Sequence, residues 1–225
     1  MTIFTLQDRE YEYFCHPFND TRHNERAVEI PIICTWVSDI RKTNPNIKIL
    51  ELGNTLQHYY LFPHDIVDKE EGGIYLPVIN KDIVDYHPDC KYDVIFSIST
   101  IEHVGREDDG NDKYKIVRAL SQLTDMLNVG GKIFVTFPIG FHPDFDSVLK
   151  EGKIPFTKVY CLHRDDYNSW IEDDFQRVLK ENDYLYEACY LGTLPQSSVA
   201  PYATEIIISY TTCLGIGIIE KGGKP

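Results

Sequence analysis

Short apolar runs and longer amphipathic stretches alternate along most of the chain. Apolar runs at residues 47–52, 64–68, 75–80 and 92–98 predict strands, and KIFVTF at 132–137 predicts another. The run YDVIFSI at 92–98 is continuously apolar, which is typical of a central parallel strand covered on both faces. These runs indicate a buried sheet.

Helical periodicity fills the segments between the strands. Apolar residues recur at three- and four-residue steps in 24–41, 112–127 and 165–182, and a short helix is expected at 55–61. The helix at 112–127 is the clearest, because Gly130 and Gly131 follow it as a stop signal.

The C-terminal part predicts two strands in succession, 184–191 and 205–212, with no helix between them. They favour a closing antiparallel pair, and the apolar stretch 205–220 is expected to be buried strand. The whole pattern predicts an α/β fold with a Rossmann-like, seven-stranded, mostly parallel sheet, helices on both faces and a C-terminal antiparallel strand pair.

Composition narrows the possible partners and compartment. A chain of 225 residues fits one domain, and no apolar run or N-terminal signal points to a membrane or to secretion, so we expect a cytoplasmic protein. The net charge of −13 argues against nucleic acid as a partner. Neither the six scattered cysteines nor the histidines show ligand spacing, so no metal is expected.

The turn after the first predicted strand is the first candidate site. Gly53 lets the backbone turn sharply and approach a ligand at the carboxyl end of the strand. Its neighbours are Glu51, which suits a cationic group, and Asn54. A single glycine is not a phosphate cradle, so the turn favours a ligand without a pyrophosphate; a plain strand-to-helix turn is the alternative.

Two further carboxylates follow the next predicted strands. Asp68 can accept hydrogen bonds from both hydroxyls of a ribose, with Asp65 as a competitor and a surface acid as the alternative. Asp82 followed by Ile83 can bind an adenine amino group and cover the ring, or can simply cap a turn.

Candidate catalytic groups leave the carboxyl end of the central strand. Glu102 and His103 are expected to point toward the reaction crevice, where a histidine could deprotonate or orient an acceptor hydroxyl, or both could be structural. His142 follows the next strand and is a second base or substrate-contact candidate. Tyr59 and His163 are weaker substrate-contact candidates.

The motifs ILELGN, HDIVD, VINKDIVD, YDVIFSISTIEHVG and LNVGGKIFVTFPIG, in this order, resemble those of class I S-adenosylmethionine-dependent methyltransferases. The resemblance covers residues 47–140 and implies S-adenosylmethionine as cofactor and S-adenosylhomocysteine as product. It places Glu51 and Gly53 at the methionine half, Asp68 at the ribose and Asp82–Ile83 at the adenine. Beneath the adenine it places Ser97, Ile98 and Ser99.

With its leader FNDTRHNERAVEIPI, the chain is similar to small bacterial methyltransferases of polysaccharide and glycan biosynthesis. The similarity implies one methyltransferase domain, 1–225, with a helical leader or lid at 1–45, a cofactor core at 46–140, and acceptor loops and closing strands at 141–225. Arg26 in the leader would lie near the cofactor carboxylate. The sequence departs from the family after Gly53, where the bulkier Asn54-Thr55-Leu56-Gln57-His58 replaces small residues.

We therefore expect methyl transfer to an oxygen of a small-molecule or saccharide acceptor, with no nucleic-acid or membrane partner; a homodimer is compatible with the sequence. Two alternatives stay open. One is a non-catalytic module that binds S-adenosylmethionine or S-adenosylhomocysteine and acts as a regulator or scaffold. The other is a Rossmann-like enzyme of another nucleotide, which the missing phosphate-binding glycines disfavour.

Overall fold

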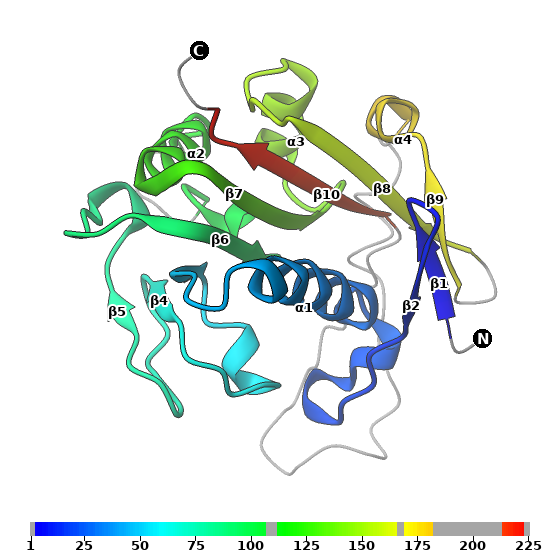
Figure 1. Cartoon of the computed structure of the whole chain (residues 1–225). Coiled ribbons are helices and arrows are strands. Elements are labelled where there is room, and N and C mark those ends of the chain that lie inside the picture. Colours follow the sequence, from blue (N-terminus) through cyan, green and yellow to red (C-terminus); the bar gives the residue numbers. More distant parts are fainter. Residues whose placement is uncertain (1–2, 107–111, 166–168, 182–212, 223–225) are drawn as a thin grey trace, which may run out of the picture.

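The computed structural model describes residues 3–106, 112–165, 169–181 and 213–222. These residues form an α/β fold built around an eight-stranded sheet of order β5-β4-β3-β6-β7-β10-β8-β9, with a separate two-stranded hairpin, β1-β2 (Figure 1). Pairing is parallel from β5 to β7, whereas β10 is antiparallel to both of its neighbours, and β9 is antiparallel to β8.

The strands are β1 (Ile3–Leu6), β2 (Arg9–Glu12), β3 (Ile49–Leu52), β4 (Asp65–Asp68), β5 (Ile79–Asn80), β6 (Tyr92–Ile98), β7 (Leu127–Pro138), β8 (Lys158–Arg164), β9 (Trp170–Asp173) and β10 (Cys213–Glu220). The helices are α1 (Arg26–Thr43), α2 (Lys115–Met126), α3 (Pro143–Lys150) and α4 (Phe175–Glu181). Short 3₁₀ turns are η1 (Phe18–His23), η2 (Leu56–His58), η3 (Ile83–Asp85) and η4 (Ile101–His103).

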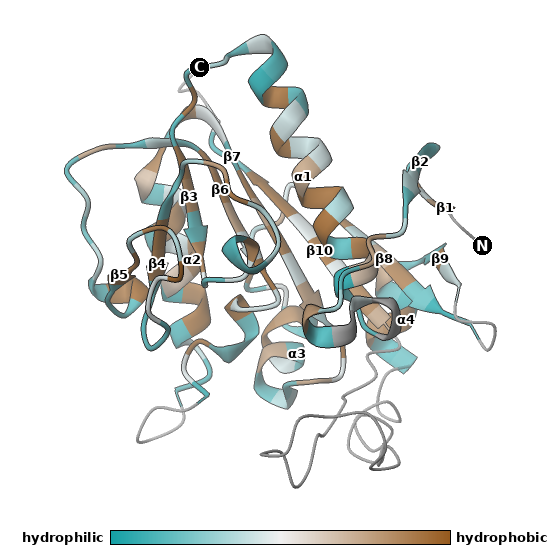
Figure 2. Ribbon diagram, turned by 90° about the horizontal axis from the view of Figure 1, so that it is seen from below, coloured by the Kyte–Doolittle hydropathy of each residue, from teal (hydrophilic) through white to brown (hydrophobic). Residues whose placement is uncertain are grey.

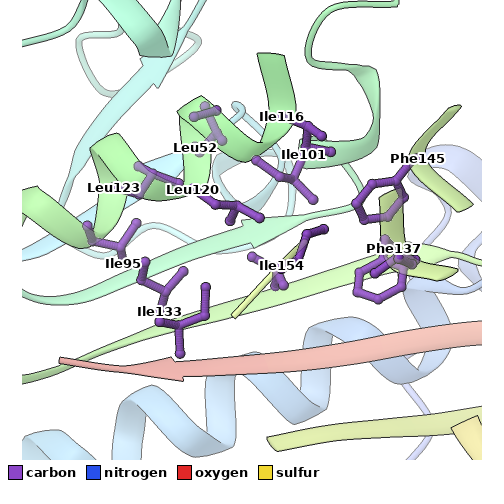
Figure 3. Close-up of a cluster of buried hydrophobic side chains, with 14 of the residues drawn as sticks. Leu52, Ile95, Ile101, Ile116, Leu120, Leu123, Ile133, Phe137, Phe145 and Ile154 are labelled. Atoms are coloured by element: carbon purple, nitrogen blue, oxygen red, sulfur yellow. The ribbon is translucent and has the colours of Figure 1, made fainter. Parts of the chain in front are cut away.

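Helices cover both faces of the sheet because the central strands are apolar on both sides. Helix α1 packs Ile30 and Ile33 against Phe96 of β6 on one face. Helix α2 packs Leu120 against β6 and β7 on the other face, which α3 and α4 also cover (Figures 2 and 3).

The elements of the core are confirmed. The strands predicted at 47–52, 64–68, 92–98 and 132–137 correspond to β3, β4, β6 and β7, and the helices predicted at 24–41 and 112–127 correspond to α1 and α2. The mixed α/β architecture with a mostly parallel sheet is also as predicted.

Several predictions outside the core are wrong. Of 75–80, only Ile79–Asn80 is strand, and the helix predicted at 55–61 is a single 3₁₀ turn. Of the helix predicted at 165–182, only the last part is helical, as α4. Trp170 belongs instead to β9, where it pairs with Arg164 of β8.

The edge of the sheet beyond β7 also differs from the prediction. Among the described residues the sheet has eight strands instead of the predicted seven, since β8 and β9 precede the closing strand. Strand β10 lies in the predicted buried stretch 205–220, but 184–191 and 205–212 lie outside the described residues. The leader contains the β1-β2 hairpin in addition to α1, because Gln7 and Asp8 adopt positive φ angles of 51° and 58° that form its turn.

Candidate functional site

A cavity of about 330 Å³ opens at the carboxyl ends of β3, β4, β5 and β6. The chain runs outward from β3 to β4 and β5, then returns to β6 on the other side of β3. Open parallel sheets bind ligands at such a switch in strand order, because the following loops diverge there. The fold therefore creates a ligand crevice at this edge.

Five of the predicted site residues line this cavity: Gly53, Asp68, Asp82, Ile83 and His103. They follow four different strands, so parallel strand direction alone brings them to the same edge. The other predicted residues do not line it: Arg26, Glu51, Asn54, Tyr59, Ser97, Ile98, Ser99, Glu102, His142 and His163.

Gly53 has a backbone conformation that other residues rarely adopt. Its φ is +92°, and its N–H donates to the carbonyl of Val67 on β4 at 2.9 Å. A Cβ atom at this position would lie 2.2 Å from Oγ1 of Thr100. Glycine is thus required both for the turn and for the close approach of the segment that follows β6.

Asp68 ends β4 and organises the loop that follows it. Its Oδ1 accepts hydrogen bonds from the N–H groups of Glu70 and Glu71, at 2.8 and 2.7 Å. This local turn fixes the carboxylate at the cavity wall, where Glu70 and Glu71 also lie.

Asp82 meets a lysine that sequence spacing did not indicate. Its Oδ1 accepts from the N–H of Val84 at 3.2 Å, and its Oδ2 lies 2.5 Å from Nζ of Lys115. Lys115 begins α2 and also lines the cavity. Only the packing of α2 beside η3 brings the two together, so no local pattern could have revealed Lys115.

Glu51 lies behind the cavity and is fully buried. Its Oε1 accepts from the N–H groups of Thr55 and Leu56 at 3.0 and 2.8 Å, and its Oε2 is 2.7 Å from Nε2 of His64. Nδ1 of His64 donates to the carbonyl of Phe62 at 2.8 Å, so Glu51 and His64 share one proton between Oε2 and Nε2. Burial raises the pKa of Glu51, whereas His64 and the two N–H groups act to lower it.

The bulky turn after Gly53 anchors the loop that precedes β5. Asn54 is buried and donates to the carbonyl of Gly72 at 3.1 Å, and its Oδ1 accepts from Gln57. Oε1 of Gln57 accepts from the N–H groups of Ile74, Tyr75 and Leu76, at 3.0, 2.9 and 3.2 Å. Asn54 and Gln57 therefore anchor the part of this loop that follows the cavity-lining residues Asp68 to Glu71.

A buried charge network joins α1 to the end of β6. Glu29 is fully buried, pairs with Arg26 at 2.5 Å and accepts from Oγ of Ser99, whose φ is +40°. Arg26 also donates to the carbonyl of Ile98 at 3.4 Å. Burial opposes the charge of Arg26, but Glu29 and Glu25 raise its pKa overall.

Ser97 is buried within β6, and its Oγ accepts or donates no hydrogen bond within the described residues. The segment after it places His103 on the cavity wall. The His103 side chain is 43% exposed, and its ring centroid is 5.3 Å from that of Phe141. Glu102 does not line this cavity and is only 1% exposed.

His142 is the N-cap of α3. Its Nδ1 accepts from the N–H of Phe145 at 3.1 Å, and burial lowers its pKa. Tyr59 packs among Phe14 and Phe18 of the leader. His163 lies on β8, 2.9 Å from Asp173 of β9, three strands along from β6.

The described part of the chain holds no group of three or more His, Cys, Asp or Glu side chains arranged to bind a metal ion. None of the described helices combines the length and the apolar character needed to cross a membrane.

No family model matches the chain, and no curated protein matches its sequence. Among solved structures, an S-adenosylmethionine-dependent methyltransferase from Clostridium acetobutylicum ATCC 824 is 13% identical, with 84% of this chain and 90% of that chain covered and a TM-score of 0.40. One from Archaeoglobus fulgidus is also 13% identical, with 86% and 94% covered and a TM-score of 0.44.

The plantazolicin methyltransferase BpumL, solved in complex with a triazolic desmethylPZN analog and SAH, is 15% identical. In that match 83% of this chain and 82% of that chain are covered, with a TM-score of 0.42. These TM-scores are below 0.5, so the likeness carries no conclusion about chemistry.

Proposed function

We propose that the cavity binds S-adenosylmethionine and that the protein transfers the methyl group to a small-molecule or saccharide acceptor, releasing S-adenosylhomocysteine. The observation that carries this proposal is the convergence of Gly53, Asp68, Asp82, Ile83 and His103 on one cavity at the switch in strand order. Its volume of about 330 Å³ is within the range of small-molecule and cofactor sites.

The lining residues fit this cofactor better than a dinucleotide. One glycine forms the turn after β3, and a pyrophosphate cradle would need several. Asp68 is fixed where its carboxylate can accept hydrogen bonds from a ribose diol, and buried Ile83 offers an apolar surface to an adenine ring. Since Lys115 holds Oδ2 of Asp82, an adenine amino group would share that oxygen with Lys115.

When bound, the cofactor supplies an electrophilic methyl group on a sulfonium. The protein aligns the acceptor, and this alignment can lower the barrier by several kcal/mol. His103 lies on the cavity wall, where its half-exposed ring can orient an acceptor hydroxyl or take its proton. The sequence further predicts an oxygen nucleophile, a role in polysaccharide biosynthesis and a cytoplasmic location. These three points stay predictions.

The test is calorimetric titration with S-adenosylhomocysteine of the parent, Asp68→Asn and Asp85→Asn. The Asp68→Asn side chain would keep the turn to Glu70 and Glu71 but lose the charge. We expect affinity to fall by about tenfold or more, since a hydrogen bond to a charged group contributes about 1.5–3 kcal/mol. Asp85 is exposed and lies outside the cavity, so its variant should bind like the parent.

No binding by the folded parent would refute the proposal. Binding without turnover in a broad acceptor screen would instead favour the non-catalytic module. If a nicotinamide nucleotide competes with S-adenosylhomocysteine for the cavity, the result would favour a Rossmann-like enzyme that uses another nucleotide.

A further inference from the structure

A second, much smaller cavity adjoins the first one. Its volume is about 10 Å³, which is the space of one water-sized group. Val104 and Gly105 line both cavities, so a group in the second lies beside the first. Glu102 and His142 form part of its wall.

Glu102 is the unusual residue of this second cavity. It is 1% exposed, and its Oε2 has no hydrogen-bond partner within the described residues. Its Oε1 is 3.9 Å from Nε2 of His103, beyond hydrogen-bond distance. A buried carboxyl group with an unpaired oxygen destabilises a fold, so such a group is typical of a site that a ligand completes.

The charged groups around Glu102 leave it short of a counter-charge. Those facing it are Glu25, Arg26 and Glu29 from α1 and its N-terminus, His103 from η4, and Asp112, Lys113, His142 and Asp144 from the opposite wall. Burial raises the pKa of Glu102 well above its usual range; Glu29 raises it further, and Arg26 opposes.

The cations in this set are already bound to other carboxylates. Arg26 pairs with Glu29 at 2.5 Å, and Lys113 pairs with Glu151 at 2.8 Å. Burial lowers the pKa of His142, which favours its neutral form. When Glu102 is ionised, the charge that its surroundings lack is therefore positive. An ammonium group matches the space and supplies both that charge and N–H donors.

Resting on the proposed function, we propose that Glu102 receives the ammonium group of the acceptor, and that the acceptor is a primary or secondary amine. Oε2 of Glu102 takes one proton from the ammonium nitrogen. The freed nitrogen lone pair forms the N–CH₃ bond while the CH₃–S bond breaks and its electron pair returns to sulfur. The products are a methylated ammonium group and S-adenosylhomocysteine. The net charge of −13 favours the approach of such a cation.

The first test compares matched amines and alcohols. Glucosamine and glucose, and a panel of amines with their hydroxyl analogues, are incubated with labelled S-adenosylmethionine and the parent, Glu102→Gln or Glu220→Gln. Glu220 is an exposed carboxylate paired with Lys132 on the far part of the sheet, so its variant is the matched control.

We expect transfer to amines, at least about a 100-fold lower turnover in Glu102→Gln, and unchanged affinity for S-adenosylhomocysteine. Three results would overturn the proposal: transfer to the alcohols in preference, full turnover in Glu102→Gln, or no transfer to any amine by a parent that binds S-adenosylhomocysteine. Failure of the parent to bind S-adenosylhomocysteine would instead refute the proposed function.

The second test needs no acceptor. A raised pKa means that the protonated carboxyl stabilises the fold at low pH and that this stability is lost as pH rises through the folded pKa. The stability of Glu102→Gln in urea, relative to the parent, should therefore increase as the pH is raised and decrease as the pH is lowered. A stability difference that does not change in this direction with pH would overturn the proposal.

Discussion

At the residue scale, the crevice depends on side chains that the sequence could single out only in part. Gly53 was recognisable because it directly follows a buried strand, and its φ of +92° agrees with the expected sharp turn. Glu51 looked like a ligand contact from the same motif, but its two oxygens bind the chain itself. Position in a motif identifies the turn, while the hydrogen-bond partners decide what each side chain is free to do.

Gly53→Ala should destabilise the protein more than Gly130→Ala. Both residues have positive φ, which costs about 1–2 kcal/mol with a side chain, but only at Gly53 would the Cβ meet Thr100, since Gly130 has open space around it. Urea unfolding measures the difference, and titration with S-adenosylhomocysteine should show weaker binding in Gly53→Ala alone. Equal losses in both variants would show that the approach of Thr100 does not matter.

At the element scale, a network of hydrogen bonds organises the turn after Gly53, where a regular helix was predicted. Residues 55–61 form only the 3₁₀ turn η2, yet Gln57 and Asn54 connect it to the loop between β4 and β5. The bulky residues after Gly53 therefore have a structural function, which is to anchor a loop that carries little secondary structure.

Gln57→Ala should loosen that loop. It leaves the N–H groups of Ile74, Tyr75 and Leu76 without their acceptor, and at about 0.5–1.5 kcal/mol for each bond the total loss is about 2–4 kcal/mol. Amide hydrogen exchange at these three residues should accelerate relative to the parent. Gln122→Ala removes hydrogen bonds to the Tyr86–His87 segment instead and should leave the exchange of the three unchanged. Unchanged exchange in Gln57→Ala would contradict the anchoring role.

At the scale of the whole molecule, several buried acids make stability depend on pH. Asp146 of α3 accepts from the N–H of Gly140 through Oδ2, while Oδ1 is buried and has no partner within the described residues. Burial raises the pKa of Asp146 to about 7. The protonated form thus stabilises the fold fully below about pH 4, and this contribution is lost as pH rises through about 7.

The free energy of unfolding should fall by ~2–4 kcal/mol between pH 5 and 8 through Asp146, an order-of-magnitude figure from its shift. Asp146→Asn should flatten this slope, because its amide does not titrate. Urea unfolding at several pH values measures it, with Asp85→Asn as the exposed control that keeps the parent slope. An unaltered slope in Asp146→Asn would mean that Asp146 titrates normally.

The central layers of the fold and the edge where the cavity lies follow from local sequence patterns alone. Nearly continuous apolar runs predict β3, β6 and β7, because strands covered on both faces are mostly apolar. Helical periodicity predicts α1 and α2. Since the carboxyl ends of parallel strands share one edge, Gly53, Asp68 and Asp82 were predictable neighbours.

The groups that complete the site depend instead on contacts between elements that are distant in the sequence. Lys115 reaches Asp82 because α2 packs beside η3, and the unpaired oxygen of Glu102 is a property of its burial among α1, η4 and α3. Strand β9 could not be predicted from the sequence either. Trp170 continues the apolar spacing of α4, and this segment is a strand because it pairs with β8. Local periodicity reports which face of an element is buried, whereas contacts between distant elements depend on how those faces pack together.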